Sequence, residues 1–137
     1  MIIADTGFFL ALANSRDQHH SVAKRALDGL VEPLVTTWPV MTETCHLVTH
    51  RLNTQAAETF VASAARGAFE IFDLGVAHLP RIVELMRKYR QLPMDLADAS
   101  LVILAEHLGT GRILSTDRRD FGAYRWKNHR PFKNLLV

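Results

Sequence analysis

Four acidic residues stand beside apolar segments typical of a protein core, and they come from widely separated parts of the chain. They are Asp5, Glu43, Asp98 and Asp117. A carboxylate next to core-forming sequence is costly unless it is solvated, paired or bound to a cation. Carboxylates drawn from distant segments into one cleft are typical of a site for a hard divalent metal. We therefore expect metal-assisted hydrolysis if the fold brings these residues together.

Short apolar runs predict the strands that would position these acids, and 3.6-residue spacing predicts the helices between them. The predicted strands span residues 2–4, 34–37, 69–72, 112–115 and 134–137. The predicted helices span residues 6–12, 22–30, 39–48, 54–66, 79–92 and 95–108. Thr54 is the expected cap of the fourth helix. Strands that alternate with helices predict an α/β fold with a central, mostly parallel sheet of four or five strands.

In an open parallel sheet, ligands bind beyond the carboxyl ends of the strands. Asp5 ends the first predicted strand and Asp117 follows the fourth, so both would project from this rim. Glu43 and Asp98 are expected in the first turns of helices that begin there. Four clustered carboxylates repel one another, and a divalent ion such as Mg²⁺ removes that conflict.

Length and composition favour one globular domain over residues 1–137, with 48% hydrophobic and 22% charged residues. Cys45 is the single cysteine, so no internal disulfide can form and a reducing cytoplasm is expected. No apolar run has the length of a membrane span and the first residues show no signal-peptide pattern, so no membrane association is expected. The net charge of +2 is too weak to require nucleic acid by itself.

Two further aspartates lie close in sequence to the four acids and could take part in the metal site. Asp95 lies three residues before Asp98 and fits a helix cap or an outer contact of the metal site. Asp120 fits a loop-capping role or an outer contact in the same way. The seven histidines show no zinc-ligand spacing. Trp38 and Trp126 are expected to be packing residues rather than platforms for bases.

The acids and their neighbours occur in an order that resembles a known family. The segments Ile3-Ala4-Asp5-Thr6, Glu43, Asp98-Ala99-Ser100-Leu101 and Ser115-Thr116-Asp117-Arg118-Arg119-Asp120-Phe121 are similar to those of a PIN domain. More closely, they resemble the VapC toxins of type II toxin–antitoxin modules. The resemblance implies a three-layer α/β/α fold and a Mg²⁺- or Mn²⁺-dependent endoribonuclease of single-stranded RNA. It also implies a homodimer that a cognate antitoxin protein holds inactive.

The resemblance also assigns roles to individual residues. It implies that Asp5, Asp98 and Asp117 hold the metal and that Glu43 assists in positioning metal or water. Thr6 and Thr116 match polar residues beside the first and last aspartates, so they are expected around the site together with Asp95 and Asp120. The family pattern therefore makes the four acids both the catalytic and the metal-binding set.

Basic residues around an acidic cleft would hold the RNA backbone while the metal acts on one phosphate. The candidates for this contact are Arg87, Lys88, Arg118 and Arg119. Two other functions remain open at the level of sequence. The same metal-binding carboxylates would suit a phosphatase or hydrolase of small phosphates, which needs a closed pocket. A non-catalytic binding module, whose acids only satisfy helix ends, is the second alternative.

Overall fold

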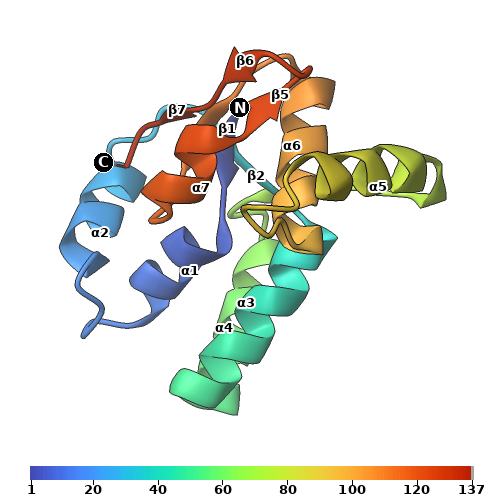
Figure 1. Ribbon diagram of the computed structural model, residues 1–137. Helices are drawn as coiled ribbons and strands as arrows, with labels where there is room; N and C mark the ends of the chain where they lie inside the picture. The colour runs from blue at the N-terminus through green and yellow to red at the C-terminus, as the bar shows by residue number, and fades with distance from the viewer. Residues whose placement is uncertain (137) are drawn as a thin grey trace.

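The computed structural model describes residues 1–136 and has a five-stranded parallel sheet at its centre (Figure 1). The strands of this sheet are β1 (Ile2–Ala4), β2 (Leu34–Thr37), β3 (Glu70–Phe72), β4 (Arg112–Leu114) and β7 (Lys133–Asn134). Their order is β3-β2-β1-β4-β7, and every pair of neighbours is parallel. The prediction of a central, mostly parallel sheet is confirmed.

Helices lie on both sides of this sheet, as expected for three layers (Figure 1). They are α1 (Thr6–Ala13), α2 (His20–Asp28), α3 (Trp38–Arg51), α4 (Thr54–Ala65), the short 3-10 helix η1 (Val76–His78), α5 (Leu79–Lys88), α6 (Leu96–Leu108) and α7 (Arg118–Ala123). Helix α6 packs against β1 and β2, and α5 packs against α6. In Figure 1, α1 and α2 lie on the opposite side of the strands, while the paired helices α3 and α4 extend away from the sheet.

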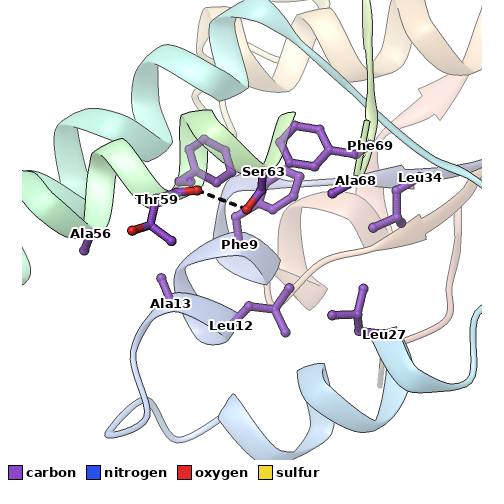
Figure 2. Close-up of a pocket in the computed structure, with 11 residues that line it drawn as sticks. Phe9, Leu12, Ala13, Leu27, Leu34, Ala56, Thr59, Ser63, Ala68 and Phe69 are labelled. Carbon is purple, nitrogen blue, oxygen red and sulfur yellow. Dashed lines mark hydrogen bonds between the residues drawn. The ribbon is translucent and has the colours of Figure 1, made fainter. Parts of the chain in front are cut away.

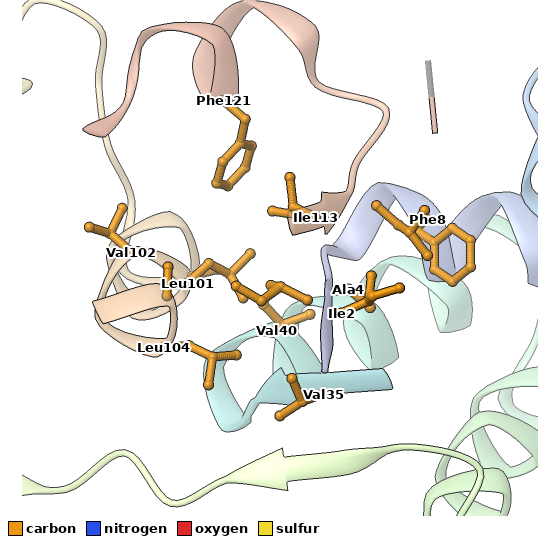
Figure 3. Close-up of a cluster of buried hydrophobic side chains, with 14 of the residues drawn as sticks. Ile2, Ala4, Phe8, Val35, Val40, Leu101, Val102, Leu104, Ile113 and Phe121 are labelled. Atoms are coloured by element: carbon orange, nitrogen blue, oxygen red, sulfur yellow. The ribbon is translucent and has the colours of Figure 1, made fainter. Parts of the chain in front are cut away.

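The core is centred on β1 and α6 (Figure 3). All three residues of β1 are buried, which explains why this strand is a continuous apolar run rather than an alternating one. Helix α6 is buried from Ala97 through Ala105 except at Asp98, so its apolar residues surround the helix instead of forming one stripe. Asp98 is therefore the exception in an otherwise buried stretch, which makes its position informative.

Several predicted boundaries differ from the structure. The third strand begins at Glu70 rather than residue 69, and the Phe69 ring is buried against Phe9 and Phe60. The last strand is Lys133–Asn134, and Val137 of the predicted strand 134–137 lies outside the described residues. Asn53, not Thr54, caps α4, since its side chain accepts a hydrogen bond from Ala56 N at 2.8 Å.

Two elements near the carboxyl end have no counterpart in the sequence prediction. Helix α7 begins at Arg118, shortly after β4 ends at Leu114, and a hairpin of β5 (Arg125–Trp126) and β6 (Arg130–Pro131) forms a separate two-stranded sheet. The turn of this hairpin contains Lys127 and Asn128 with φ of 50° and 65°. Within residues 1–136, no helix is both long and apolar enough to cross a membrane.

Candidate functional site

Asp5 lies where β1 ends and α1 begins, and it is 7% exposed. One carboxylate oxygen caps α1 by accepting a hydrogen bond from Thr6 N at 2.7 Å. The other accepts one from Ser115 Oγ at 2.8 Å. Burial, followed by the negative charges of Glu43 and Asp117, raises the pKa of Asp5 to about 6, although both hydrogen bonds act in the opposite direction. Asp5 is thus a buried acid whose ionised form lacks a compensating positive charge.

Ser115 connects two of the predicted metal ligands. Its hydroxyl donates to Asp5 and accepts a hydrogen bond from Asp117 N at 3.0 Å. This link exists because β1 and β4 are parallel neighbours, with Ala4 opposite Leu114, so that both strands end at the same point. Asp5 and Asp117 are therefore held at one rim, as the sequence predicts.

Ser115 is a site residue that sequence reasoning assigned to the fourth strand. Strand β4 ends one residue earlier, at Leu114, which leaves Ser115 free to turn its buried hydroxyl toward Asp5. The available signal was a hydroxyl residue two positions before Asp117. Thr116, expected beside the site, lies against Gly7, since a Cβ built on Gly7 would be 2.0 Å from Thr116 Oγ1.

Asp98 occupies the first turn of α6 and belongs to a capping box with Asp95. Asp95 is the N-cap, as one of the two sequence interpretations has it, and its Oδ1 accepts from Asp98 N at 2.8 Å. The Tyr124 hydroxyl donates to Asp98 Oδ2 at 3.2 Å. Burial, then the charges of Asp95 and Asp5, raises the pKa of Asp98. Tyr124 is fully buried and is a second site residue absent from the sequence prediction.

Glu43 is half-buried and lies in the second turn of α3, not in the first turn as predicted. Its pKa is raised by burial and by the charge of Asp95, while the nearby Thr6 hydroxyl lowers it. The buried Thr6 Oγ1 nevertheless has no hydrogen-bond partner of ordinary geometry within residues 1–136. An unsatisfied buried hydroxyl between two acids is the kind of position that a ligand or a bound water satisfies.

Asp117 and Asp120, both considered near the metal site from the sequence, have different surroundings in the structure. Asp117 caps α7 by accepting a hydrogen bond from Asp120 N at 2.9 Å, and burial raises its pKa. Asp120 is buried, and its Oδ1 accepts a hydrogen bond from the exposed Arg119 at 3.0 Å. Asp117 therefore lies beside Ser115 at the rim, whereas Asp120 is already partnered.

The acids influence one another electrostatically. The negative charges of Glu43 and Asp117 raise the pKa of Asp5, and those of Asp95 and Asp5 raise the pKa of Asp98. None of the ion pairs among residues 1–136 includes Asp5, Glu43, Asp98 or Asp117. These are hard oxygen donors without a protein cation, next to the unsatisfied Thr6 hydroxyl, and this donor chemistry fits Mg²⁺ or Mn²⁺.

The side chains are not arranged as a closed metal cage. Within residues 1–136, no three His, Cys, Asp or Glu side chains converge closely enough to coordinate one ion directly. Mg²⁺ is held in proteins through one or two carboxylates and several waters, and it does not need a cage made only of side chains. The geometry therefore fits an ion that is bound partly through water.

The four basic residues expected to contact RNA lie in two places. Arg118 and Arg119 open α7 directly after Asp117, and both are exposed. Arg87 and Lys88 end α5, where Lys88 Nζ donates to Asn128 O at 3.3 Å in the turn of the β5–β6 hairpin. Only the α7 pair is adjacent in sequence to a predicted metal ligand.

A second feature is an apolar groove of about 420 Å³ between α1, α2 and α4 (Figure 2). Its walls carry Phe9 and Leu12 from α1, Leu27 from α2 and Phe60 from α4, with Phe69 at one end. Leu27 remains 40% exposed on the groove. Its lining includes no acidic residue, so it is chemically separate from the carboxylates.

Comparisons with known proteins agree with this fold. The PIN domain family matches residues 2–127. Ribonuclease VapC26 of Mycobacterium tuberculosis (strain ATCC 25618 / H37Rv) is 31% identical over 124 residues, which cover 90% of this chain and 92% of that protein.

Two solved structures share the fold. The crystal structure of Mycobacterium tuberculosis VapC20, described as a Sarcin-Ricin loop cleaving toxin, superposes with a TM-score of 0.85 at 23% identity. That similarity covers 96% of this chain and 100% of VapC20. A toxin–antitoxin complex from Klebsiella pneumoniae superposes with a TM-score of 0.65 at 20% identity, covering 90% of this chain and 92% of the matched one.

Proposed function

The chain belongs to the PIN-domain family and, within it, to the VapC ribonucleases, and we propose that it is a metal-dependent endoribonuclease that acts as the toxin of a toxin–antitoxin pair. Residues 1–137 would form one nuclease domain that works in the cytoplasm. The observation that carries the proposal is the buried Asp5 carboxylate. Ser115 connects it to Asp117, and no protein cation within residues 1–136 pairs with it.

Asp5, Asp98 and Asp117 would hold Mg²⁺ or Mn²⁺, with Glu43 positioning the ion or a water. A bound divalent ion supplies activation of water and neutralisation of charge on the phosphate. Ser115 and the backbone of Thr6 fix both oxygens of Asp5. Tyr124 donates a hydrogen bond to Asp98 and so orients its carboxylate. Thr6, Asp95, Thr116 and Asp120 would support the site without contacting the ion directly.

The test is cleavage of a single-stranded RNA oligonucleotide by the purified protein, with Mg²⁺ or Mn²⁺ and with a chelator. We expect cleavage only with the metal, and we expect Asp98→Asn to lower kcat/KM at least about 100-fold, as loss of a central electrostatic group does. Glu58→Gln on the exposed side of α4 is the matched control and should keep full activity. Intact RNA together with turnover of nitrophenyl phosphate would instead identify a phosphatase.

The antitoxin would dock in the apolar groove between α1, α2 and α4 (Figure 2). A groove lined by aromatic and aliphatic side chains accepts the apolar face of an amphipathic helix. Leu27→Glu places a charge on this surface and should abolish co-purification with the protein of the adjacent upstream reading frame. Val31→Glu is the control, since Val31 is 96% exposed and does not line the groove. RNA cleavage should survive both substitutions.

A second copy of the chain would pack against α5. Leu79, Val83 and Met86 recur at helical spacing on this helix, and each remains exposed. An apolar stripe of this kind is typical of an interface. Light scattering should give the mass of a dimer for the wild type and that of a monomer for Val83→Glu. A monomeric wild type would contradict the dimer and leave the nuclease proposal intact.

A further inference from the structure

Trp38 lies next to the acids and is unexpectedly exposed. It is the first residue of α3, directly after β2, and 54% of its surface is accessible to solvent. Trp126 is 6% exposed, and its indole N–H donates to Pro131 O at 3.1 Å. The expectation that both tryptophans are packing residues is therefore right for Trp126 and wrong for Trp38.

The half-exposed Trp38 ring has no aromatic or cationic neighbour within residues 1–136. Trp38 takes part in none of the aromatic pairs or cation–π contacts of this part of the chain. Trp126, by contrast, has Lys127 and Arg130 over its ring at 5.8 and 5.4 Å. The indole N–H of Trp38 also has no partner among the protein hydrogen bonds of residues 1–136, whereas that of Trp126 does. An exposed indole without partners is costly to keep in water and is typical of a contact surface.

The groove at Trp38 has the chemistry of a base-binding surface. It has a volume of about 640 Å³, and its apolar part includes Trp38, Leu74 and Leu96. Glu43 and Asp95 line the same groove, and no Lys or Arg does. Where no metal ion offsets them, these two carboxylates repel a phosphate group. A flat, neutral group fits better, since it can stack on the indole without meeting a like charge.

We propose that Trp38 is a stacking platform for an unpaired RNA base that lies beside the phosphate held at the acidic cluster. The proposal rests on the proposed ribonuclease function and adds a subsite to it. Base stacking on an aromatic side chain tolerates different bases, because every base has a π face. The subsite would therefore favour single-stranded RNA over a duplex without fixing the base sequence.

A second copy of the chain fits this groove less well than a base does. Covering it with a second copy of the chain would bury the carboxylates of Glu43 and Asp95 without a cation, which is unfavourable. A stacked base covers the indole and leaves both carboxylates in contact with water. The exposed stripe on α5 carries Leu79, Val83 and Met86, and it provides an uncharged surface for a second copy elsewhere.

Steady-state cleavage of a single-stranded RNA with Mn²⁺ tests the stacking directly. We expect Trp38→Ala to raise KM about tenfold or more with kcat changed less than about threefold, because the lost contact binds a part of the substrate that does not react. Trp38→Phe should keep KM within about threefold, since it retains an aromatic face. Trp38→Leu keeps apolar area without a π face and should resemble Trp38→Ala.

Fluorescence gives a second readout, since Trp38 and Trp126 are the only tryptophans of the chain. In the inactive Asp98→Asn protein with Mg²⁺, added RNA should quench the emission of the exposed Trp38. The Trp38→Phe, Asp98→Asn protein, which emits only from the buried Trp126, should show almost no quenching. Equal quenching in both proteins would overturn the assignment.

Three results separate the possible failures. An unchanged KM in Trp38→Ala, with an active wild type, would overturn the stacking and leave the ribonuclease proposal standing. A Trp38 emission that shifts with protein concentration in the absence of RNA, together with a lower mass for Trp38→Ala, would assign the surface to a second copy and also overturn it. A wild-type protein that cleaves no RNA with either metal would contradict the ribonuclease function itself.

Discussion

The hydroxyl of Ser115 donates a hydrogen bond of 2.8 Å to Asp5 Oδ2, across 110 residues of sequence. Ser115 Oγ in turn accepts a hydrogen bond from Asp117 N at 3.0 Å. One buried side chain therefore fixes a carboxylate from the end of β1 and the backbone that carries the next acid after β4. Hydrogen bonds to a ligating carboxylate set its orientation and tune its affinity for metal.

Ser115→Ala should weaken Mn²⁺ binding by about 10- to 100-fold, because Asp5 and Asp117 lose their shared hydrogen-bond partner. Isothermal titration calorimetry measures this change. Ser115→Thr retains the hydroxyl and is the matched control, which should lie closer to the wild type. Equal affinities for Ser115→Ala and the wild type would mean that the bond has no part in metal binding.

Tyr124→Phe removes the donor to Asp98 Oδ2 and keeps the ring that fills the core. Because this bond lowers the pKa of Asp98, its loss should raise that pKa and move the acidic limb of the pH–activity profile to higher pH. Tyr89→Phe is the control: Tyr89 packs edge-on against Tyr124, and its hydroxyl accepts a hydrogen bond from Arg125 N instead. Coincident profiles for Tyr124→Phe and the wild type would contradict the role of this hydroxyl.

Stability should depend on pH through Asp5. Its pKa is raised from 3.8 to about 6, mainly by burial, so the folded state binds this proton more tightly than the unfolded chain does. Without metal, the free energy of unfolding should therefore fall as pH rises from about 4 to about 6, by up to about 3 kcal/mol from this group. Urea unfolding at pH 4.5 and 7.5, in wild type and Asp5→Asn, measures it. The variant should show the smaller difference, and equal differences would exclude Asp5 as the cause.

With bound metal, the stability of the protein should rise with pH instead of falling. Carboxylates bind metal in their ionised form, so Mn²⁺ affinity should rise with pH through about 6 as Asp5 loses its proton. At pH 7.5, saturating Mn²⁺ should raise the melting temperature of the wild type and leave that of Asp5→Asn nearly unchanged. Calorimetry at pH 5.5 and 7.5 provides the direct comparison of affinities.

Arg118 should contribute more to RNA binding than Lys88. Arg118 follows Asp117 directly at the start of α7, whereas Lys88 Nζ donates to Asn128 O in the hairpin. Arg118→Gln should raise KM. It should also lower the slope of log affinity against log salt concentration by about 1, the contribution of one phosphate contact, while Lys88→Gln should change both quantities much less. KM measured between 50 and 200 mM salt, about the range in which phosphate contacts are lost, tests the order of the two effects.

The sequence predicted the sheet and the rim because β1 and β4 are short apolar runs, each followed directly by polar residues. It placed Asp5 and Asp117 together because parallel strands end on one side. It did not predict Tyr124, whose hydroxyl reaches Asp98 only through the packing of the segment after α7 against α6. It also missed the exposure of Trp38, since an aromatic residue beside Pro39 has the same sequence signature whether its ring is buried or solvated.

Gly7 is held by a contact with Thr116, a residue far away in the sequence. Gly7 lies in α1, where alanine would normally stabilise the helix by about 1 kcal/mol. A Cβ at this position would be 2.0 Å from Thr116 Oγ1 and 3.2 Å from Thr116 Cβ. Gly7→Ala should therefore destabilise the protein by about 1–3 kcal/mol, as overpacking does, and should disturb the segment that carries Asp117.

A double-mutant cycle separates this clash from a general effect on α1. In a Thr116→Ala background the hydroxyl is absent, so Gly7→Ala should cost much less than it does alone. Gly122→Ala in α7 is the control, because a Cβ there has no neighbour within 4 Å, and it should be neutral or stabilising. Additive effects of Gly7→Ala and Thr116→Ala on the urea midpoint would contradict the contact. A strong coupling would show that Thr116 supports the site by packing against the start of α1.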